Sequence, residues 1–216
     1  NYPEWMLIYW ACACSGIAVV GMNAWWTAEE MAYALTDSAP KVVFLDAERL
    51  DRIRERPEVA NKTKLVGIRI SDAGADVTPW SEVIAHDGAM PDIPVDPDSD
   101  CCIFYTSGTT GHPKGAQLTH RGCVSNLFNM VYAATSASLA TQRATGVVPP
   151  EDPPVPVTLI TTPLFHVTAN NCGAYAVTAA GGTLVLMYRW DAGEALRLNR
   201  HIQPYVLGGR RRAGAA

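Results

Sequence analysis

Short apolar runs of strand length alternate with segments of helical character along most of this chain. The expected strands are 41–46, 65–70, 101–105, 157–161 and 183–187, and the expected helices include 47–56, 80–86, 120–140, 167–180 and 192–201. Alternation favours parallel pairing, because a chain that crosses over between parallel strands covers a sheet face with the crossing helix. The sequence therefore predicts an α/β fold with mostly parallel sheets covered by helices.

Residues 5–26 carry no charged side chain, and this stretch is long enough to cross a bilayer as one helix. Its internal pattern argues against a membrane span. Gly16 and the following run 17–20, rich in β-branched residues, interrupt the helical periodicity and favour a buried helix, a turn and a short strand. Residues 172–188, which contain two adjacent glycines, have the same pattern. We therefore expect no transmembrane helix.

A helix-start signal lies at Thr27 and Glu30, three residues apart. In this capping-box arrangement the threonine oxygen and the glutamate carboxylate each accept a hydrogen bond from a backbone N–H that the helix leaves unsatisfied. We therefore expect a helix that begins near Ala28 and ends around residues 37–40, just before the expected strand 41–46.

The composition excludes some partners and indicates a compartment. The formal net charge is −4 with 18% charged residues, so the chain has no general attraction for nucleic acid or for an anionic membrane. Its six cysteines show neither CxxC pairs nor neighbouring histidines at metal-ligand spacing, which favours buried free thiols. Free thiols are typical of a reducing environment, so we expect a cytoplasmic protein.

Residues 106–115 follow an expected strand and hold four hydroxyl side chains, three glycines and one lysine. Glycines let backbone N–H groups approach phosphate oxygens, hydroxyls add donors, and Lys114 adds a positive charge, so the segment suits a polyanion such as a triphosphate. It is not a Walker A loop, because Pro113 stands where that pattern requires glycine and Gly115 follows the lysine. A polar surface loop between strands is the alternative interpretation.

The longer stretch 105–120 resembles the signature of the adenylate-forming superfamily, which includes acyl-CoA synthetases, luciferases and the adenylation domains of peptide synthetases. Residues 1–46 are also similar to that family. The resemblance implies that the loop embraces the β- and γ-phosphates of ATP while a substrate carboxylate attacks the α-phosphorus. The phosphate contacts that it implies are Thr106, Ser107, Gly108, Thr109, Thr110, Gly111, Pro113 and Lys114.

The same resemblance assigns roles to individual residues. It gives Lys114 a catalytic role in neutralising phosphate charge, and it makes Thr110 a contact for Mg²⁺. Residues 162–166 are similar to the family's next motif, which lines the acyl pocket. Phe165 and His166 would then lie near the carboxylic acid, with His166 catalytic as a gate. Outside this motif, His166 would be interpreted as a packed, hydrogen-bonded histidine.

Three later elements of the family have no counterpart in these residues: the aromatic-Gly-x-Thr-Glu motif, the ribose-binding aspartate, and the C-terminal domain with its catalytic lysine. The resemblance thus implies an incomplete acyl-CoA-synthetase-like N-terminal domain over residues 1–201, with subregions 1–90 and 101–201. Residues 202–216 depart from the family pattern and are expected to be an aberrant tail. Their three adjacent arginines are interpreted as solvated side chains and not as a nucleic-acid site.

These observations give one leading hypothesis and two alternatives. In the leading hypothesis the parent enzyme uses ATP and Mg²⁺ to convert a fatty or other hydrophobic carboxylic acid to acyl-AMP and passes the acyl group to CoA, whereas this chain alone is inactive. The first alternative is a non-catalytic binding or oligomerising module. The second is an adenylation domain that serves a carrier-protein thiol. A homo-oligomer is expected under either view.

Overall fold

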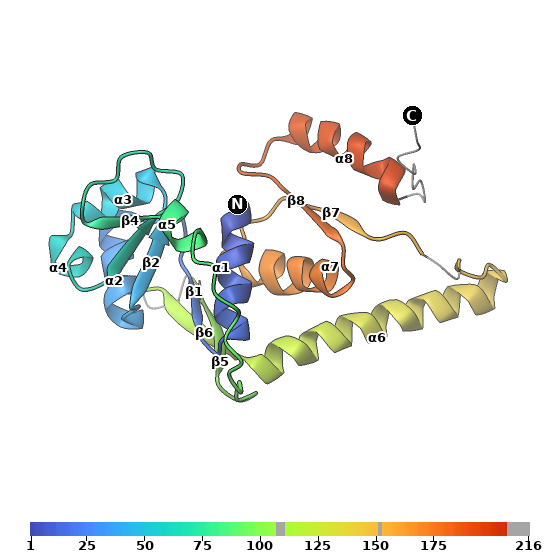
Figure 1. Ribbon diagram of the computed structural model, residues 1–216. Coiled ribbons are helices and arrows are strands. Elements are labelled where there is room, and N and C mark those ends of the chain that lie inside the picture. Colours follow the sequence, from blue (N-terminus) through green and yellow to red (C-terminus); the bar gives the residue numbers. More distant parts are fainter. Residues whose placement is uncertain (107–110, 151–152, 207–216) are drawn as a thin grey trace. The chain divides into compact units, whose positions relative to one another are not determined.

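The computed structural model describes residues 1–106, 111–150 and 153–206, with side chains through residue 202 (Figure 1). The chain divides into two compact units. One unit, called the loop unit because it contains the loop 106–114, comprises Ile8–Leu118. The other, called the turn unit because it contains the turn 162–166, comprises Asn1–Leu7 and the chain from Thr119 onward. Helix α1 (Pro3–Cys14) contributes residues to both.

The loop unit contains two three-stranded sheets. In the first, β5 (Asp100–Thr106) lies between β1 (Val19–Gly21) and β6 (Lys114–Thr119), and β1 pairs with β5 in parallel. In the second, β3 (Lys64–Gly67) lies between β2 (Val42–Leu45) and β4 (Val77–Pro79), and both pairs are parallel. The helices of this unit are α2 (Ala28–Ser38), α3 (Ala47–Arg54), α4 (Pro57–Ala60) and α5 (Trp80–Ile84).

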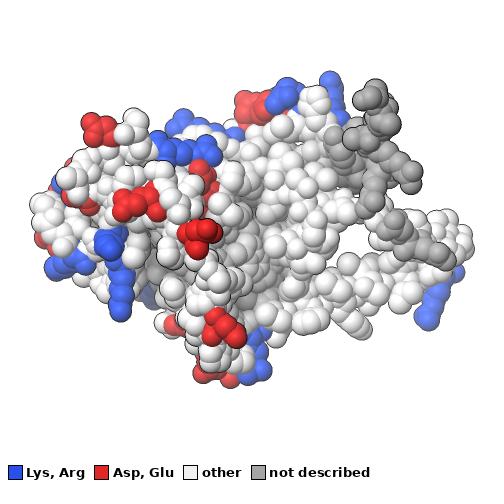
Figure 2. All heavy atoms as spheres, viewed as in Figure 1, with Lys and Arg blue, Asp and Glu red and all other residues white. Residues whose placement is uncertain are grey.

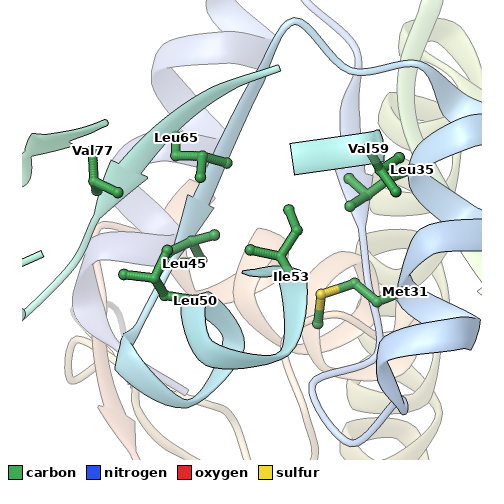
Figure 3. Packing of buried hydrophobic residues seen from close by; sticks show 8 residues of the cluster. All are labelled: Met31, Leu35, Leu45, Leu50, Ile53, Val59, Leu65 and Val77. Carbon is green, nitrogen blue, oxygen red and sulfur yellow. The ribbon is translucent and has the colours of Figure 1, made fainter. Parts of the chain in front are cut away.

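A hydrophobic core joins the second sheet of the loop unit to its helices (Figure 3). The side chains come from strands with apolar residues and from the apolar faces of α2, α3 and α4, so the sheet face and the helix faces are removed from water together. The buried members are Met31, Leu35, Leu45, Leu50, Ile53, Val59, Leu65 and Val77. This core fixes α2, the helix that matters for the site below.

The starts of α2 and α3 are fixed by side-chain caps. The expected capping box is confirmed, since the Glu30 N–H donates to Thr27 Oγ1 at 3.3 Å and the Thr27 N–H donates to the Glu30 carboxylate at 2.8 Å. Asp46 caps α3 in the same way, accepting from the Arg49 N–H. Both caps satisfy donors that the first helical turn leaves open.

The turn unit is built around a two-stranded parallel sheet of β7 (Val157–Ile160) and β8 (Thr183–Leu186). Its helices are α6 (His120–Thr145), the π-helix η1 (Thr168–Ala174), α7 (Tyr175–Ala179) and α8 (Ala192–Val206). A small core of Ile160, Leu164 and Ala169 is packed against Trp5, Met6, Leu184 and Leu186.

The predicted α/β fold is confirmed. The uncharged stretch 5–26 forms α1, a turn with Gly16 at φ 66°, and β1, as expected. Across the described residues, no helix is both long and apolar enough to span a membrane. Strands β4 and β6 and helix α4 were not predicted, because their sequences lack an apolar run or a helical pattern of sufficient length. Residues 168–174 form a π-helix within the segment expected to be an ordinary helix.

Candidate nucleotide-binding site

The loop expected to bind phosphate connects two neighbouring strands, β5 and β6. At one end of the pair the Gln117 amide donates to the Asp100 carboxylate at 3.2 Å, and at the other the Thr106 hydroxyl donates to the Lys114 carbonyl at 3.5 Å. The first residue of β5 therefore lies beside the end of β6, and the last residue of β5 lies beside the start of β6. The strands therefore run antiparallel, and Thr106 and Lys114 bring the two ends of the loop together.

The described part of the loop offers groups suited to a phosphate. The Thr106 and Lys114 side chains are exposed where the loop leaves and rejoins the sheet. Gly111 has φ 92°, a backbone conformation that favours glycine. A Cβ at this position would meet no atom within 4 Å, so the space around it is open. A Cβ on Gly115 would approach Ile103 Cγ2 at 2.9 Å, which favours glycine at that position too.

Half of the expected phosphate contacts fall within the described residues. Thr106, Gly111, Pro113 and Lys114 lie at the two ends of the loop, where the hairpin holds them near one another. Ser107, Gly108, Thr109 and Thr110 lie outside the described residues, and so does the Mg²⁺ contact expected at Thr110.

Helix α2 contacts the residue before the loop and a residue near the end of the loop. Before the loop, the Tyr105 hydroxyl donates to the Asp37 carboxylate at 2.6 Å. Near the end of the loop, the His112 ring stacks on the Tyr33 ring, with centroids 4.8 Å apart and an interplanar angle of 20°. Neither Tyr33 nor Asp37 was predicted from the sequence. Their spacing of four residues places them on one helix face, but nothing in the sequence indicates which strand that face meets.

Tyr105 is also enclosed by an aromatic neighbour from the segment before α2. The buried Trp26 ring meets it edge to face, with centroids 5.5 Å apart. Arg52 donates to the Trp26 carbonyl at 2.9 Å, so this segment is tied to α3 as well. Burial, followed by the hydrogen bond to Asp37, raises the pKa of Tyr105 well above its ordinary value. The phenol therefore stays protonated and remains a hydrogen-bond donor at neutral pH.

Phe165 and His166 belong to a turn in the other unit, directly after β7. Leu164 in this turn is 2% exposed and packs in the core of the turn unit. The Asn1 side chain holds the turn on both sides, accepting from the Leu164 N–H at 2.8 Å and donating to the Thr162 carbonyl at 2.9 Å. These contacts, all within the turn unit, hold the turn in place.

The exposed His166 ring is oriented by a local hydrogen bond. The Thr168 N–H donates to His166 Nδ1 at 3.2 Å, at the start of the π-helix. Because Nδ1 accepts, Nε2 is the ring nitrogen left to carry the proton. The expectation of a hydrogen-bonded histidine is met, but the ring is exposed and not packed in the interior.

A chain of buried polar side chains lies beneath this turn. Trp5 Nε1 donates to Asn170 Oδ1 at 3.0 Å, Asn170 Nδ2 donates to Asn171 Oδ1 at 3.1 Å, and Asn171 Nδ2 donates to Cys123 Sγ at 3.2 Å. Asn170 and Asn171 are the buried polar residues of the π-helix. Buried amides are stable only when hydrogen-bonded, so this network specifies how α1, α6 and η1 meet inside the turn unit.

The six cysteines, all in described segments, form no disulfide. Cys101, Cys102 and Cys123 are buried, as expected, and Cys12 is half-buried, with burial raising the pKa of its thiol. Cys14 and Cys172 are exposed, so the expectation of buried thiols does not hold for these two.

An α/β fold of mostly parallel sheets, with a glycine- and hydroxyl-rich loop after the central strand of one sheet, is typical of enzymes that bind nucleotides. Comparison with known families agrees with this class. The chain belongs to the AMP-binding enzyme family, whose model matches residues 1–208. The resemblance inferred from residues 105–120 is thereby confirmed.

Curated relatives of this chain are CoA ligases. A feruloyl-CoA synthase from Amycolatopsis sp is 30% identical over 91% of this chain and 34% of its own length. A 4-coumarate–CoA ligase 2 from Petroselinum crispum is 28% identical over 95% of this chain and 35% of its own length. The chain thus spans about a third of the length of the curated relatives that it matches.

Among solved structures, a protein from Rhodopseudomonas palustris described as a long-chain-fatty-acid CoA ligase superposes with a TM-score of 0.69. The match covers 93% of this chain and 46% of the other, at 24% identity. This similarity supports the predicted α/β fold.

Proposed function

We propose that residues 106–114 bind the triphosphate of ATP and that the whole enzyme uses this site to activate a hydrophobic carboxylic acid as its CoA thioester. The observation that carries the proposal is the hairpin that brings Thr106 and Lys114 together, with Gly111 in a positive-φ conformation between them. Membership in the AMP-binding family supports ATP as the ligand.

In the proposed reaction a carboxylate oxygen of the acid forms a bond to the α-phosphorus of ATP. The bond from that phosphorus to the bridging oxygen of pyrophosphate breaks, and pyrophosphate leaves with the electron pair. The thiol of CoA then attacks the acyl carbon, and AMP is released. Because the first step brings anions together, it depends on positioning and on neutralisation of phosphate charge.

The residues of this chain would divide that task. Lys114 supplies a positive charge to the phosphates, and Thr106 supplies a hydroxyl donor at the mouth of the loop. Mg²⁺ prefers oxygen ligands, which a triphosphate and the Thr110 hydroxyl would provide. Phe165 and His166 would contact the acid, with His166 Nε2 as the available donor.

The chemical class of the acid is part of this proposal. The leading choice is a fatty or other hydrophobic carboxylic acid, and the two curated relatives favour testing ferulate and 4-coumarate beside fatty acids. CoA is proposed as the acceptor, with a carrier-protein thiol as the alternative. We place the reaction in the cytoplasm, which the absence of disulfides among the six cysteines supports.

We further propose that the 216-residue chain binds ATP but turns it over poorly by itself. The motif that helps bind adenine, the ribose-binding aspartate and the catalytic lysine expected from the family are not present in this sequence. Release of pyrophosphate by the chain with ATP and a fatty acid, at rates of the order of 1 s⁻¹ or more, would contradict this part of the proposal.

The ATP site is tested by isothermal titration calorimetry of the chain with ATP and Mg²⁺. Removal of one charge-assisted contact is expected to weaken binding by about ten-fold or more in Lys114→Ala. Lys62→Ala is the matched control, because Lys62 is an exposed lysine of the same unit that lies outside the loop. Equal affinities in Lys114→Ala and the unaltered chain would overturn the proposal.

A second candidate function, self-association through α6, is favoured by the surface of that helix. Among its 26 residues Cys123 is buried, whereas large apolar side chains are exposed, with Phe128 at 67% and Tyr132 at 75%. Its charged residues are Arg121 and Arg143, near its two ends. On the face that Figure 2 shows, the surface along α6 is accordingly white over most of its length.

Light scattering of the purified chain, with and without ATP and Mg²⁺, separates the two candidates. If a second copy covers α6, the molar mass exceeds that of one chain, and Phe128→Glu restores the monomer. Ala137→Glu is the control, because a residue nine positions after Phe128 lies on the opposite face of the helix. A monomer at all concentrations would remove the second candidate.

A further inference from the structure

We propose that α2 holds in place the two described ends of the phosphate-binding loop, at Tyr105 and His112, with Asp37 and Tyr33 as its positioning residues. This inference rests on the proposed ATP site and adds residues that neither the loop motif nor the comparisons indicate. Its basis is that one helix face contacts the residue before the loop and a residue near its end, Tyr105 and His112.

The contact before the loop is a short hydrogen bond supported by packing. The Tyr105 hydroxyl donates to Asp37 Oδ2 at 2.6 Å, and the Tyr105 hydroxyl oxygen also lies 3.4 Å from the Ala34 carbonyl oxygen, one turn earlier on α2. Trp26 meets the Tyr105 ring edge to face. A neutral phenol that donates to a carboxylate makes a charge-assisted bond, which is stronger than a bond between neutral groups.

The contact near the end of the loop is a ring stack. His112 lies between Gly111 and Pro113, and its ring stacks on Tyr33. Tyr33 is half-buried, so its ring offers a fixed surface to the exposed imidazole. A stacked pair of this kind contributes beyond its buried area.

Because Tyr33 and Asp37 are four residues apart, they project from the same face of one capped helix. Both ends of the loop therefore contact a single rigid element, α2, whose other face is packed in the core of the loop unit. A loop whose ends are already fixed loses less conformational entropy when it binds a ligand, so α2 would raise ATP affinity without touching ATP.

Asp37 permits a test that separates positioning from charge. Its carboxylate is negative, so a simple electrostatic effect on a bound triphosphate would make both Asp37→Ala and Asp37→Asn bind ATP more tightly. Positioning through the hydrogen bond predicts different results. Asp37→Asn keeps an acceptor for Tyr105 and retains the affinity, whereas Asp37→Ala loses the bond and weakens ATP binding by about three- to ten-fold.

The experiment is calorimetric titration of the chain and its variants with ATP and Mg²⁺, with thermal unfolding measured in parallel. Tyr105→Phe is expected to match Asp37→Ala, and the double variant to be no weaker than either single one, because both remove the same bond. Tyr33→Ala is expected to weaken binding by a similar factor, and Tyr33→Phe, which keeps the stack, to restore it.

Asp76→Ala is the matched control, because it removes an exposed carboxylate that precedes β4 in the same unit and pairs with Arg54 at 2.8 Å. It is expected to leave ATP affinity unchanged. If Lys114→Ala weakens binding while Asp37→Ala, Tyr105→Phe and Tyr33→Ala do not, the role of α2 is overturned and the ATP site stands. If Lys114→Ala has no effect, the ATP site itself fails.

Discussion

The loop at 106–114 and the turn at 162–166 are held in place by different kinds of contact. The ends of the loop are held by residues of α2, about 70 positions earlier in the sequence, through the Tyr105–Asp37 bond and the His112–Tyr33 stack. The turn is held by hydrogen bonds from the Asn1 side chain to the backbone of Thr162 and Leu164, by the Thr168 N–H bond to His166, and by the buried Leu164 side chain. The loop therefore depends on the stability of a distant helix, and the turn depends on the core directly beneath it.

The largest expected effect is on the turn. Leu164→Ala removes a side chain that is 2% exposed in a small core, and the cavity should lower the free energy of unfolding by about 2–5 kcal/mol. Chemical denaturation measures the change. Leu196→Ala, at a site 62% exposed in the same unit, should cost less than about 0.5 kcal/mol. Equal losses in the two variants would mean that the turn does not rest on this core.

An intermediate effect is expected at the start of α2. Thr27→Ala removes the capping box and should lower the free energy of unfolding by about 1 kcal/mol. Because α2 holds the ends of the loop, ATP binding should weaken as well. Asp191→Ala removes a comparable cap in the turn unit, where Asp191 accepts from the Glu194 N–H at 2.7 Å. Asp191→Ala should reduce the free energy of unfolding by a similar amount. A loss of ATP affinity in this variant would contradict the distinction between the two regions.

The smallest expected effect concerns pH. Burial first, and then the bond to Asp37, raises the pKa of Tyr105 from its ordinary 10.0 in the folded state. Below the unfolded value both states keep the proton, and above it only the unfolded state loses it. The contribution to stability is thus complete below about pH 10 and is lost as the pH rises further. Thermal unfolding between about pH 9 and about pH 11 should therefore show a steeper decline for the unaltered chain than for Tyr105→Phe.

An identical decline in the two proteins would show that this phenol is not in the environment described. The measurement has an internal reference, because the two proteins differ at one side chain and the effects of all their other titratable groups cancel in the comparison.

The difference between the regions also explains what could be predicted from the sequence. Local signals gave α1 with its turn and strand, the capping box at Thr27, and most strands and helices, because periodicity and caps are properties of neighbouring residues. Strand β6, which is polar, exists through pairing with β5, and that pairing has no local signal. The Asp37–Tyr105 contact could not be predicted from the sequence for the same reason, because it joins two elements whose packing depends on the whole fold.

The exposure of Cys14 and Cys172 was not predicted either. Burial is decided by which face of an element meets its neighbours, and Cys14, the last residue of α1, is exposed although the preceding Ala13 is buried. Residue type alone favoured a buried thiol at both positions.

The affinities of the chain for ATP, ADP and AMP, measured side by side by calorimetry with Mg²⁺ present, test the central claim most directly. If residues 106–114 bind the β- and γ-phosphates, affinity falls steeply from ATP to AMP, by about ten-fold or more for the complete loss of both phosphates. Equal affinity for the three nucleotides would mean that this loop does not bind the triphosphate, and the account would be wrong.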